Sequence, residues 1–490
     1  MLTPLDPRQW DVTRAAHLLN RAGFGGNPGQ IEALHAIGFD KAVSSILDAP
    51  DDALQFPRPA DINPVDTLAM RQQVMMLPEE QRKQKQQELQ KQQRRDMPGI
   101  VAWWLDRMAQ TPNPLREKMT LFWHGNFATS VQKVKQAYLM WQQNDTLRQH
   151  ALGNFGDLAK AVSRDPAMMI YLDTRESKKE HPNENFAREL MELFMLGIGN
   201  YTEEDIQNSA RAFTGYKIDP RDGTFRYAPF QHDNGVKTFF GQSGKFDGDD
   251  IINLVLQKPA CAQFITRKLW AFFAYENPKP ELVAQLGESF RGYQYGIKPM
   301  MGEIFRSAEF YSPRAIRMQI KSPVQWMVQT SKILETGMPP PVVAANALRQ
   351  MGQIPFAPPN VKGWDGGKAW ITTSTLLFRY NLSNFELSNG ALNIQAMNKI
   401  AAADKAAGRP AREVQNRKPV DLAKIAPPEL RADPGKLVSS LTFRLYQSPL
   451  SAKETKPYLD FLKEKNNDTS DQTVRELLHL MMSTPQYQLT

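Results

Sequence analysis

The sequence is poor in cysteine, the residue that forms disulfide frameworks and thiolate metal clusters. Cys261 is the only cysteine in 490 residues, which excludes a disulfide framework and a cluster of thiolate metal ligands. No apolar run approaches the about 18 residues that a membrane-spanning helix needs. The first twenty residues show no apolar core of a secretory signal, so we expect either a cytoplasmic protein or an exported one whose signal is absent or trimmed.

Familiar catalytic signatures are missing as well. The chain contains no GxSxG nucleophile elbow, no P-loop, no HExxH metal motif and no dinucleotide-binding fingerprint. Its net charge of +8 favours an acidic polymer or a membrane surface as a partner. The basic residues are spread along the chain, however, and no nucleic-acid motif accompanies them. We therefore expect no nucleic-acid partner.

Helical periodicity dominates what is present, and it predicts a mainly α fold: a multi-helix globular bundle with a small β-hairpin element near residues 217–250. Thr202, followed by Asp205, predicts the capping box of one helix. Within the β element, residues 224–227 and 237–240 have strand character. Asn234-Gly235 between them is typical of a type I′ hairpin turn.

The chain divides into four regions by composition. We expect N-terminal helices over 1–66, an arm rich in glutamine and charge over 67–99, a central helical body with the polar motifs over 100–390, and a linker with C-terminal helices over 391–490. Between residues 79 and 96 the only apolar side chain is Leu89, so this stretch has no face to bury. It predicts a solvated helical arm or a partly disordered insertion; an arm that binds a partner is the alternative.

Residues 183–194 form the most informative segment. Three carboxylates, an arginine and two amides lie here among bulky apolar residues. At about 100° per residue, Glu184, Arg188, Glu189 and Glu192 fall on one arc of a helix. Bulky apolar residues share that arc, which indicates charges held in a cleft where their pKa values are tuned. The alternative is a surface helix with ordinary ion pairs four positions apart.

Three other places carry candidate functional side chains. His124 directly follows an apolar helix, where it could act as an acid, a base or a ligand, or could simply cap the helix. His232-Asp233 is either a pair at a cleft or part of a turn. Trp364 and Asp365 lie in a loop rich in proline and glycine, which either contacts a ligand ring or covers the core.

Taken together, seven segments resemble the motifs of one bacterial family, in order. They are residues 17–25, 122–124, 183–194, 201–203, 211–215, 232–233 and 359–364. The family is catalogued as domain of unknown function 1800, and the resemblance covers nearly the whole chain. It implies no activity, because none is assigned to the family. Members are often encoded beside a second exported family with an alkaline-phosphatase-like fold, which implies a candidate protein partner. They commonly carry a second histidine where this chain has Asn126, and this departure argues against two histidines binding a metal there.

We interpret the polar segments as the site of a hydrolase acting on a carbohydrate or a related polymer. Glu189 and Glu192, three positions apart, would supply a general acid and a general base. Arg188 would lower the pKa of one of these carboxylates, while burial and crowding would raise that of the other. The alternative is a non-catalytic partner or export-linked scaffold, in which the same groups form a buried structural network.

The hypothesis assigns a role to each candidate side chain. The candidate catalytic residues are His124, Glu184, Arg188, Glu189 and Glu192. The candidate substrate-binding residues are Asn126, Asn183, Asn185, His232, Asp233, Trp364 and Asp365. We expect no cofactor; a divalent metal bound by His124, His232, Asp233 and a glutamate is a variant of the hypothesis.

Overall fold

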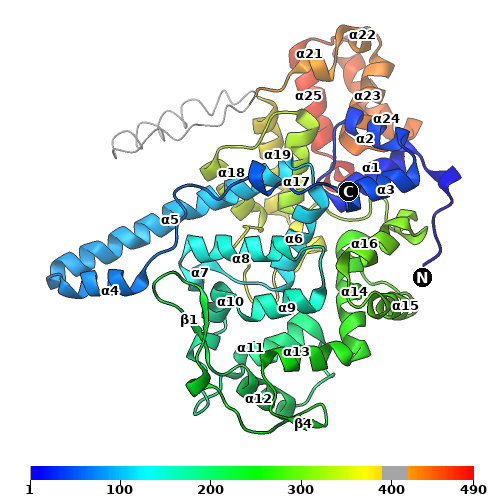
Figure 1. Ribbon diagram of the computed structural model, residues 1–490. Coiled ribbons are helices and arrows are strands. Elements are labelled where there is room, and N and C mark those ends of the chain that lie inside the picture. Colours follow the sequence, from blue (N-terminus) through cyan, green and yellow to red (C-terminus); the bar gives the residue numbers. More distant parts are fainter. Residues whose placement is uncertain (1, 389–417) are drawn as a thin grey trace.

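The protein is built mainly from helices, as the sequence predicts. A computed structural model describes residues 2–388 and 418–490 (Figure 1). In this part of the chain, strands form only two small antiparallel two-stranded sheets. Helices begin where the sequence supplies a cap: the Asp11 side chain accepts a hydrogen bond from Arg14 N at the start of α1 (Val12–Ala22).

One hydrophobic core lies beneath the N-terminal helices and the central body. Trp123 fixes the position of one of its central helices, α6, because its ring stacks on Phe155 with centroids 5.6 Å apart and its indole N–H donates to Ala151 O at 3.0 Å. The helices around this core are α1, α2 (Pro28–Ala36), α3 (Phe39–Leu47), α6 (Pro114–Asn126), α9 (Phe155–Ser163), α10 (Pro166–Tyr171), α11 (Glu184–Glu189), α12 (Glu203–Ala212), α13 (Gly248–Gln257), α14 (Pro259–Phe273), α15 (Pro280–Gly292) and α16 (Ile297–Arg306).

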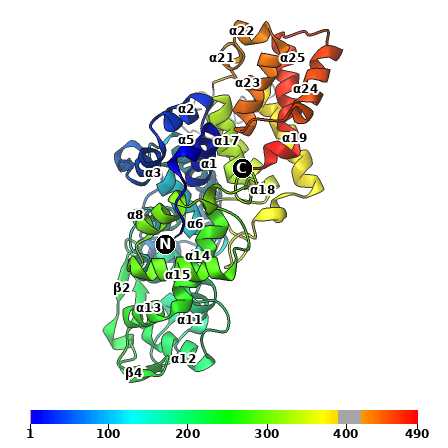
Figure 2. The ribbon, with the colours of Figure 1, turned by 90° about the vertical axis from the view of Figure 1, so that its right-hand side faces the viewer.

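A second core joins the middle of the chain to its C-terminal end. Figure 2 shows the C-terminal helices at one end of an elongated molecule and α12 at the other. Leu121 of α6 belongs to this second core, whereas Met119 and Trp123 belong to the first, so α6 connects the two. The helices of the second core are α5 (Glu79–Gln110), α7 (Val131–Val134), α8 (Ala137–Gln149), α17 (Pro323–Leu334), α18 (Pro341–Met351), α19 (Thr373–Leu387), α21 (Leu422–Ile425), α22 (Pro428–Arg431), α23 (Pro434–Tyr446), α24 (Ala452–Glu464) and α25 (Asp471–Met482).

The region rich in glutamine and charge projects from the body as a pair of helices, α4 (Thr67–Met76) and the outer half of α5 (Figure 1). None of the described side chains from residue 67 to 96 is buried. The inner half of α5 is buried through Ile100, Trp104 and Met108. Composition divides the chain between residues 99 and 100, and α5 crosses this boundary as one continuous helix of 32 residues that passes through Pro98.

The β element is present where the sequence predicts it, but the predicted strand pairing is wrong. The two predicted strands each pair with a different neighbour rather than with each other. The pairs are β1 (Tyr216–Ile218) with β2 (Phe225–Tyr227), and β3 (Lys237–Phe239) with β4 (Gln242–Gly244).

The physical reason is that Asn234-Gly235 is not a hairpin turn. The Asp233 side chain accepts a hydrogen bond from Gly235 N at 2.7 Å, which anchors this loop locally. The turn between β3 and β4 is formed by Phe240 and Gly241, whose φ angles of 49° and 76° are those of a type I′ turn. A non-glycine residue thus occupies a position that sequence rules reserve for asparagine or glycine.

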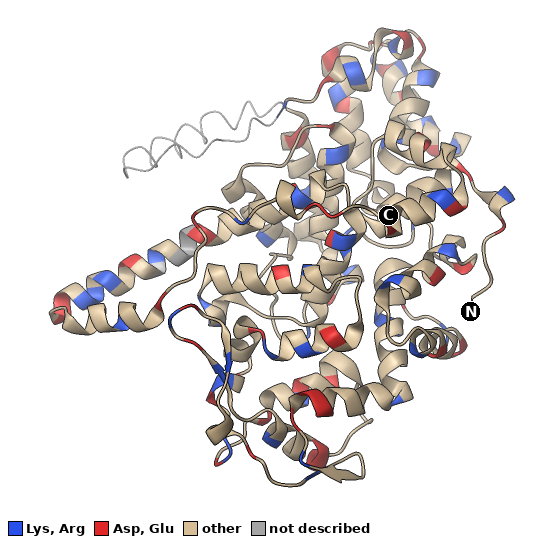
Figure 3. Cartoon of the chain, viewed as in Figure 1, with Lys and Arg blue, Asp and Glu red and all other residues tan. Residues whose placement is uncertain are grey.

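Charge is distributed over the whole molecule. Figure 3 shows lysine and arginine interspersed with aspartate and glutamate on helices of every region. None of the described helices is long and apolar enough to cross a membrane. The start of the predicted C-terminal linker lies outside the described residues; from residue 418 the chain is described again, with Leu422 and Ile425 buried.

Candidate functional site

The carboxylate-rich segment is a helix that changes type in its middle. After Glu189, α11 continues as a π-helix from Leu190 to Met195. Leu196 N accordingly donates to the carbonyl five residues back, Met191 O, at 3.0 Å. π-Helical turns are rare and frequently occur at functional sites. Since Glu192 lies in this turn, the change of helix type sets where its carboxylate lies relative to that of Glu189.

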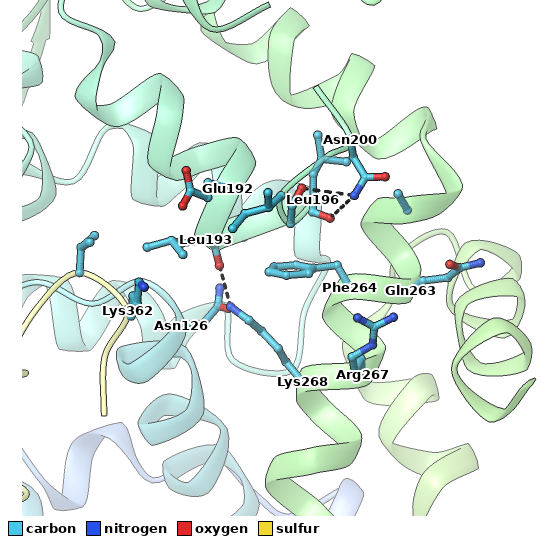
Figure 4. Close-up of a pocket in the computed structure, with 14 residues that line it drawn as sticks. Asn126, Glu192, Leu193, Leu196, Asn200, Gln263, Phe264, Arg267, Lys268 and Lys362 are labelled. Carbon is cyan, nitrogen blue, oxygen red and sulfur yellow. Dashed lines mark hydrogen bonds between the residues drawn. The ribbon is translucent and has the colours of Figure 1, made fainter. Parts of the chain in front are cut away.

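An open groove of about 560 Å³ runs beside the π-helix (Figure 4). Its walls come from the end of α6, from the π-helix and the loop after it, from α14, and from residues 361–362. Asn126 and Glu192 are the predicted site residues that line it. The lining side chains are Asn126, Glu192, Leu193, Leu196, Ile198, Asn200, Ala260, Gln263, Phe264, Arg267, Lys268, Val361 and Lys362.

Glu192 lines this groove, and Glu189, three positions earlier, does not line it but feels the charge of Glu192. Burial, and then the charge of Glu192, raise the pKa of Glu189, while Arg188 and Lys362 partly oppose this. Tyr201 donates from its hydroxyl to Glu192 Oε2 at 3.1 Å. Burial and this bond raise the pKa of Tyr201 to about 12, so the hydroxyl stays protonated and donates. The two carboxylates therefore lie in different environments.

Arg188 and Glu184 pair away from the groove. Both Arg188 Nη atoms donate to the Glu203 carboxylate at 2.8 Å, and Nη2 also reaches Glu184 Oε2 at 3.2 Å. These partners raise the pKa of Arg188 above its usual value. Asn183 caps α11 by accepting from Asn185 N at 2.9 Å. For Glu184 and Arg188, the structure thus agrees with the alternative interpretation, a surface helix with ordinary ion pairs. Exposed pairs of this kind contribute little stability.

Lys268 holds the end of the π-helix against α6 and α14. Its ammonium donates to Leu193 O at 2.6 Å and to Asn126 Oδ1 at 2.7 Å, and the Asn126 amide donates to Phe194 O at 3.4 Å (Figure 4). The Phe264 ring lies 4.5 Å from Nζ. Burial lowers the pKa of Lys268 to about 8. Among the residues the structure describes, no carboxylate forms an ion pair with this half-buried ammonium.

His124 is fully buried and does not line the groove. Its Nε2 accepts a hydrogen bond from Phe356 N at 2.9 Å, and its ring lies 5.3 Å from Trp104 and 6.0 Å from Trp364, centroid to centroid. Burial lowers the pKa of His124 to about 3, so the imidazole is neutral. It positions the start of the loop that follows Phe356; direct proton transfer by His124 stays a prediction.

His232 and Asp233 join the β element to α12. His232 Nδ1 donates to Thr214 O at 3.0 Å, and Arg211 donates to Asp233 through Nε at 2.7 Å. That arginine is the main cause of the lowered pKa of Asp233. Neither side chain lines the groove, so substrate binding by this pair stays a prediction. In residues 2–388 and 418–490, no group of three or more His, Cys, Asp and Glu is placed to hold a metal ion.

The loop rich in proline and glycine brings Lys362 to the groove. Gly363 has a φ of 85°, and a Cβ there would lie 2.4 Å from Gly125 O, so only glycine permits this close approach to α6. Trp364 and Asp365 follow, half-buried and exposed respectively, and neither is among the lining residues. A role for these two side chains in binding stays a prediction.

Sequence reasoning missed four residues of the site: Tyr201, Arg267, Lys268 and Lys362. The basic pair on α14 has no local signal, because Lys268 meets Asn126 from 142 positions away. Lys362 lies inside the 359–364 motif, but the functional interpretation of this loop rests on its proline and tryptophan residues rather than on the lysine.

Comparison with known proteins gives a family and no relative of known activity. A search of curated proteins finds no match, and neither does a search of solved structures. The model of the family described as "Protein of unknown function (DUF1800)" matches residues 17–489. Because this match spans nearly all of the helices and every wall of the groove, the chain belongs to the DUF1800 family.

Proposed function

We propose that the groove is the active site of a hydrolase acting on a carbohydrate or a related polymer, with Glu189 as general acid and Glu192 as general base. The observation that supports the proposal is the raised pKa of Glu189 beside Glu192, a second carboxylate that lines an open groove. Two neighbouring carboxyl groups in different environments commonly serve as the acid and the base in glycoside hydrolysis.

The chemistry needs only these two groups and a water molecule. Glu189 gives its proton to the oxygen of the leaving group as the bond to that oxygen breaks. Glu192, which accepts a hydrogen bond from the Tyr201 hydroxyl, takes a proton from the attacking water, whose oxygen forms the new bond. The amides of Gln263 and Asn200 on the groove walls suit the hydroxyls of a sugar.

The first test is turnover of a panel of polysaccharides, measured as the release of reducing ends. Glu189→Gln and Glu192→Gln should each lower the rate by about 10²–10⁴-fold, because each removes one proton-transfer group. Glu204→Gln is the matched control, since Glu204 is exposed on the neighbouring helix α12 and does not line the groove. Retention of full activity by both groove variants would refute the assignment.

The second test is the pH profile. Activity should fall as pH rises through the pKa of Glu189, which must be protonated, and this limb should lie above the usual range of a glutamate. Lys362 lowers that pKa by its charge, so Lys362→Gln should move the alkaline limb to higher pH. Lys279→Gln, at an exposed lysine outside the groove, should leave it in place.

The second candidate function is a non-catalytic partner of the exported alkaline-phosphatase-like family. The observation in its favour is the exposed apolar tip of the arm, where Met75 and Met76 are 70% and 84% exposed. Co-purification of the two proteins should then depend on these methionines and be lost in Met75→Ser/Met76→Ser. Equal recovery with the wild-type and altered arm would remove this candidate.

A further inference from the structure

The groove holds a half-buried cation, Lys268, that acid–base catalysis does not use. We propose that Lys268, with Arg267 and Lys362, binds a carboxylate or sulfate group of an acidic polysaccharide. This inference deepens the proposed function, on which it rests for treating the bound polymer as the substrate. Binding itself can be measured without turnover, so the two ideas can fail separately.

The first argument is the missing counter-ion of Lys268. Buried charges are normally paired, because an isolated ion loses its hydration without compensation. Both described acceptors of this ammonium, Leu193 O and Asn126 Oδ1, are neutral oxygens. An ammonium has three donors, so one is left for a ligand on the groove side. An anion in the groove would supply the opposite charge and a charge-assisted hydrogen bond.

The second argument is the charge of the surrounding walls. Arg267 and Lys362 are exposed at the groove, from α14 and from the loop before Gly363, and neither forms an ion pair with a described residue. Figure 4 shows Lys362 on the side opposite Arg267, with Lys268 between them. Three cations thus face a single lining carboxylate, Glu192. A neutral sugar would leave this excess of positive charge unused.

The third argument concerns the class of anion. Single-stranded nucleic acid is usually bound along a track of basic residues with several aromatic stacking platforms. Here the cations gather at one groove, and Phe264 is its only lining aromatic side chain among the described residues. Amides at Gln263 and Asn200 suit hydroxyl groups. Hydroxyls with regularly repeated acidic groups are the chemistry of uronate and sulfated polysaccharides.

The test is calorimetric titration with trigalacturonate at about pH 6.5, where the Lys268 ammonium is protonated. The neutral control is the same trisaccharide with its carboxylates methyl-esterified. A sulfated carrageenan tetrasaccharide forms the second arm, and it distinguishes sulfate from carboxylate as the preferred group. We expect at least one acidic oligosaccharide to bind, the ester to bind at least about tenfold more weakly, and added salt to weaken the interaction.

The same titration with substituted proteins tests whether the acidic ligand binds in the groove. Lys268→Met should lower the affinity for the acidic ligand by at least about tenfold, and Arg267→Gln and Lys362→Gln should lower it by about threefold to fivefold each. Glu192→Gln should tighten binding, since it removes from the groove lining a negative charge that repels the acidic ligand. Lys279→Gln is the control and should bind as the wild type does. If Lys268→Met does not fold, the double variant at Arg267 and Lys362 replaces it, with an expected loss of about tenfold.

Several results would overturn the inference. Equal affinity for acid and ester, absence of binding in both acidic arms, or wild-type affinity in the double variant would each do so. Tighter binding of a deoxythymidine decamer than of either sugar would instead assign the groove to nucleic acid. Acidic binding that persists in Glu189→Gln, without cleavage of any polymer by the wild type, would support the anion site and reject the hydrolase.

Discussion

Two polar clusters in this protein differ in how their charged side chains are paired. Where α5, α6 and α8 meet, Glu117 accepts from Trp104 Nε1 at 2.7 Å and from Arg148 Nε at 2.6 Å, and it contacts Arg107 at 2.8 Å. Arg107 also binds Asp52 at 2.5 Å. Burial alone would raise the pKa of Glu117, but Arg148 and Arg107 outweigh it and hold that pKa below its usual value. Every carboxylate here has a cationic partner.

The groove cluster is arranged the other way. Glu189 has the like charge of Glu192 beside it, and Lys268 has only neutral acceptors among the described residues. This difference indicates which cluster has a functional role. A fully paired cluster stabilises the junction of helices, whereas incomplete pairing leaves charged groups available to bind a ligand. Substitutions in the two clusters should therefore have opposite consequences for stability.

The largest expected effect is in the paired cluster. Glu117→Gln should lower the free energy of unfolding by about 3–5 kcal/mol, because it leaves two buried arginines without their shared carboxylate. Urea denaturation followed by circular dichroism measures it. Glu204→Gln serves as the exposed control. A loss below about 1 kcal/mol would show that the network is not a stabilising one.

The next effect is the pH dependence conferred by His124. Its folded-state pKa of about 3 lies below the unfolded value of about 6.5, so the unfolded chain binds the proton first as pH falls. Stability is therefore lost between these two values, at up to roughly 1.4 kcal/mol per pH unit. His124→Gln retains an acceptor for Phe356 N and should flatten this slope. An unchanged slope would contradict the buried neutral ring.

A smaller effect of opposite sign is expected in the groove. Glu189→Gln and Glu192→Gln should leave the melting temperature unchanged or raise it, because each relieves the repulsion between the two carboxylates. Scanning calorimetry on both variants measures this. If both melt markedly lower, the carboxylates belong to a structural network like that of Glu117, and the scaffold hypothesis takes precedence.

The smallest effect is expected from the arm. Replacing its tip, residues 70–86, by a short Gly-Ser turn should shift the melting temperature by less than about 2 °C, because no described side chain there is buried. Thermal unfolding of the shortened protein tests this. A loss of several degrees would mean that the arm docks on the body in solution.

Much of the fold follows from local sequence, because its causes are local. The predicted capping box is present, with Thr202 accepting from Asp205 N and the Asp205 carboxylate accepting from Thr202 N. Helical periodicity likewise predicts the helices, since each is stabilised by bonds within its own turns. The incorrect strand pairing shows the limit. The turn lies at Phe240, against the usual backbone preference of this residue, and distant residues contact it there: Phe240 N donates to Asp205 Oδ1 at 2.9 Å, and Lys258 Nζ lies 4.3 Å from its ring.

The sequence by itself determined the family, the mainly helical fold and the presence of two carboxylates three positions apart near an arginine. Only the tertiary structure decided that Arg188 pairs with Glu203, that His124 is buried and that Lys268 meets Asn126 at the end of a π-helix. The reason is that burial and partner choice set the pKa of a side chain, and both depend on segments that are distant in the chain. Residue type and spacing specify which groups are available, and packing specifies their charge.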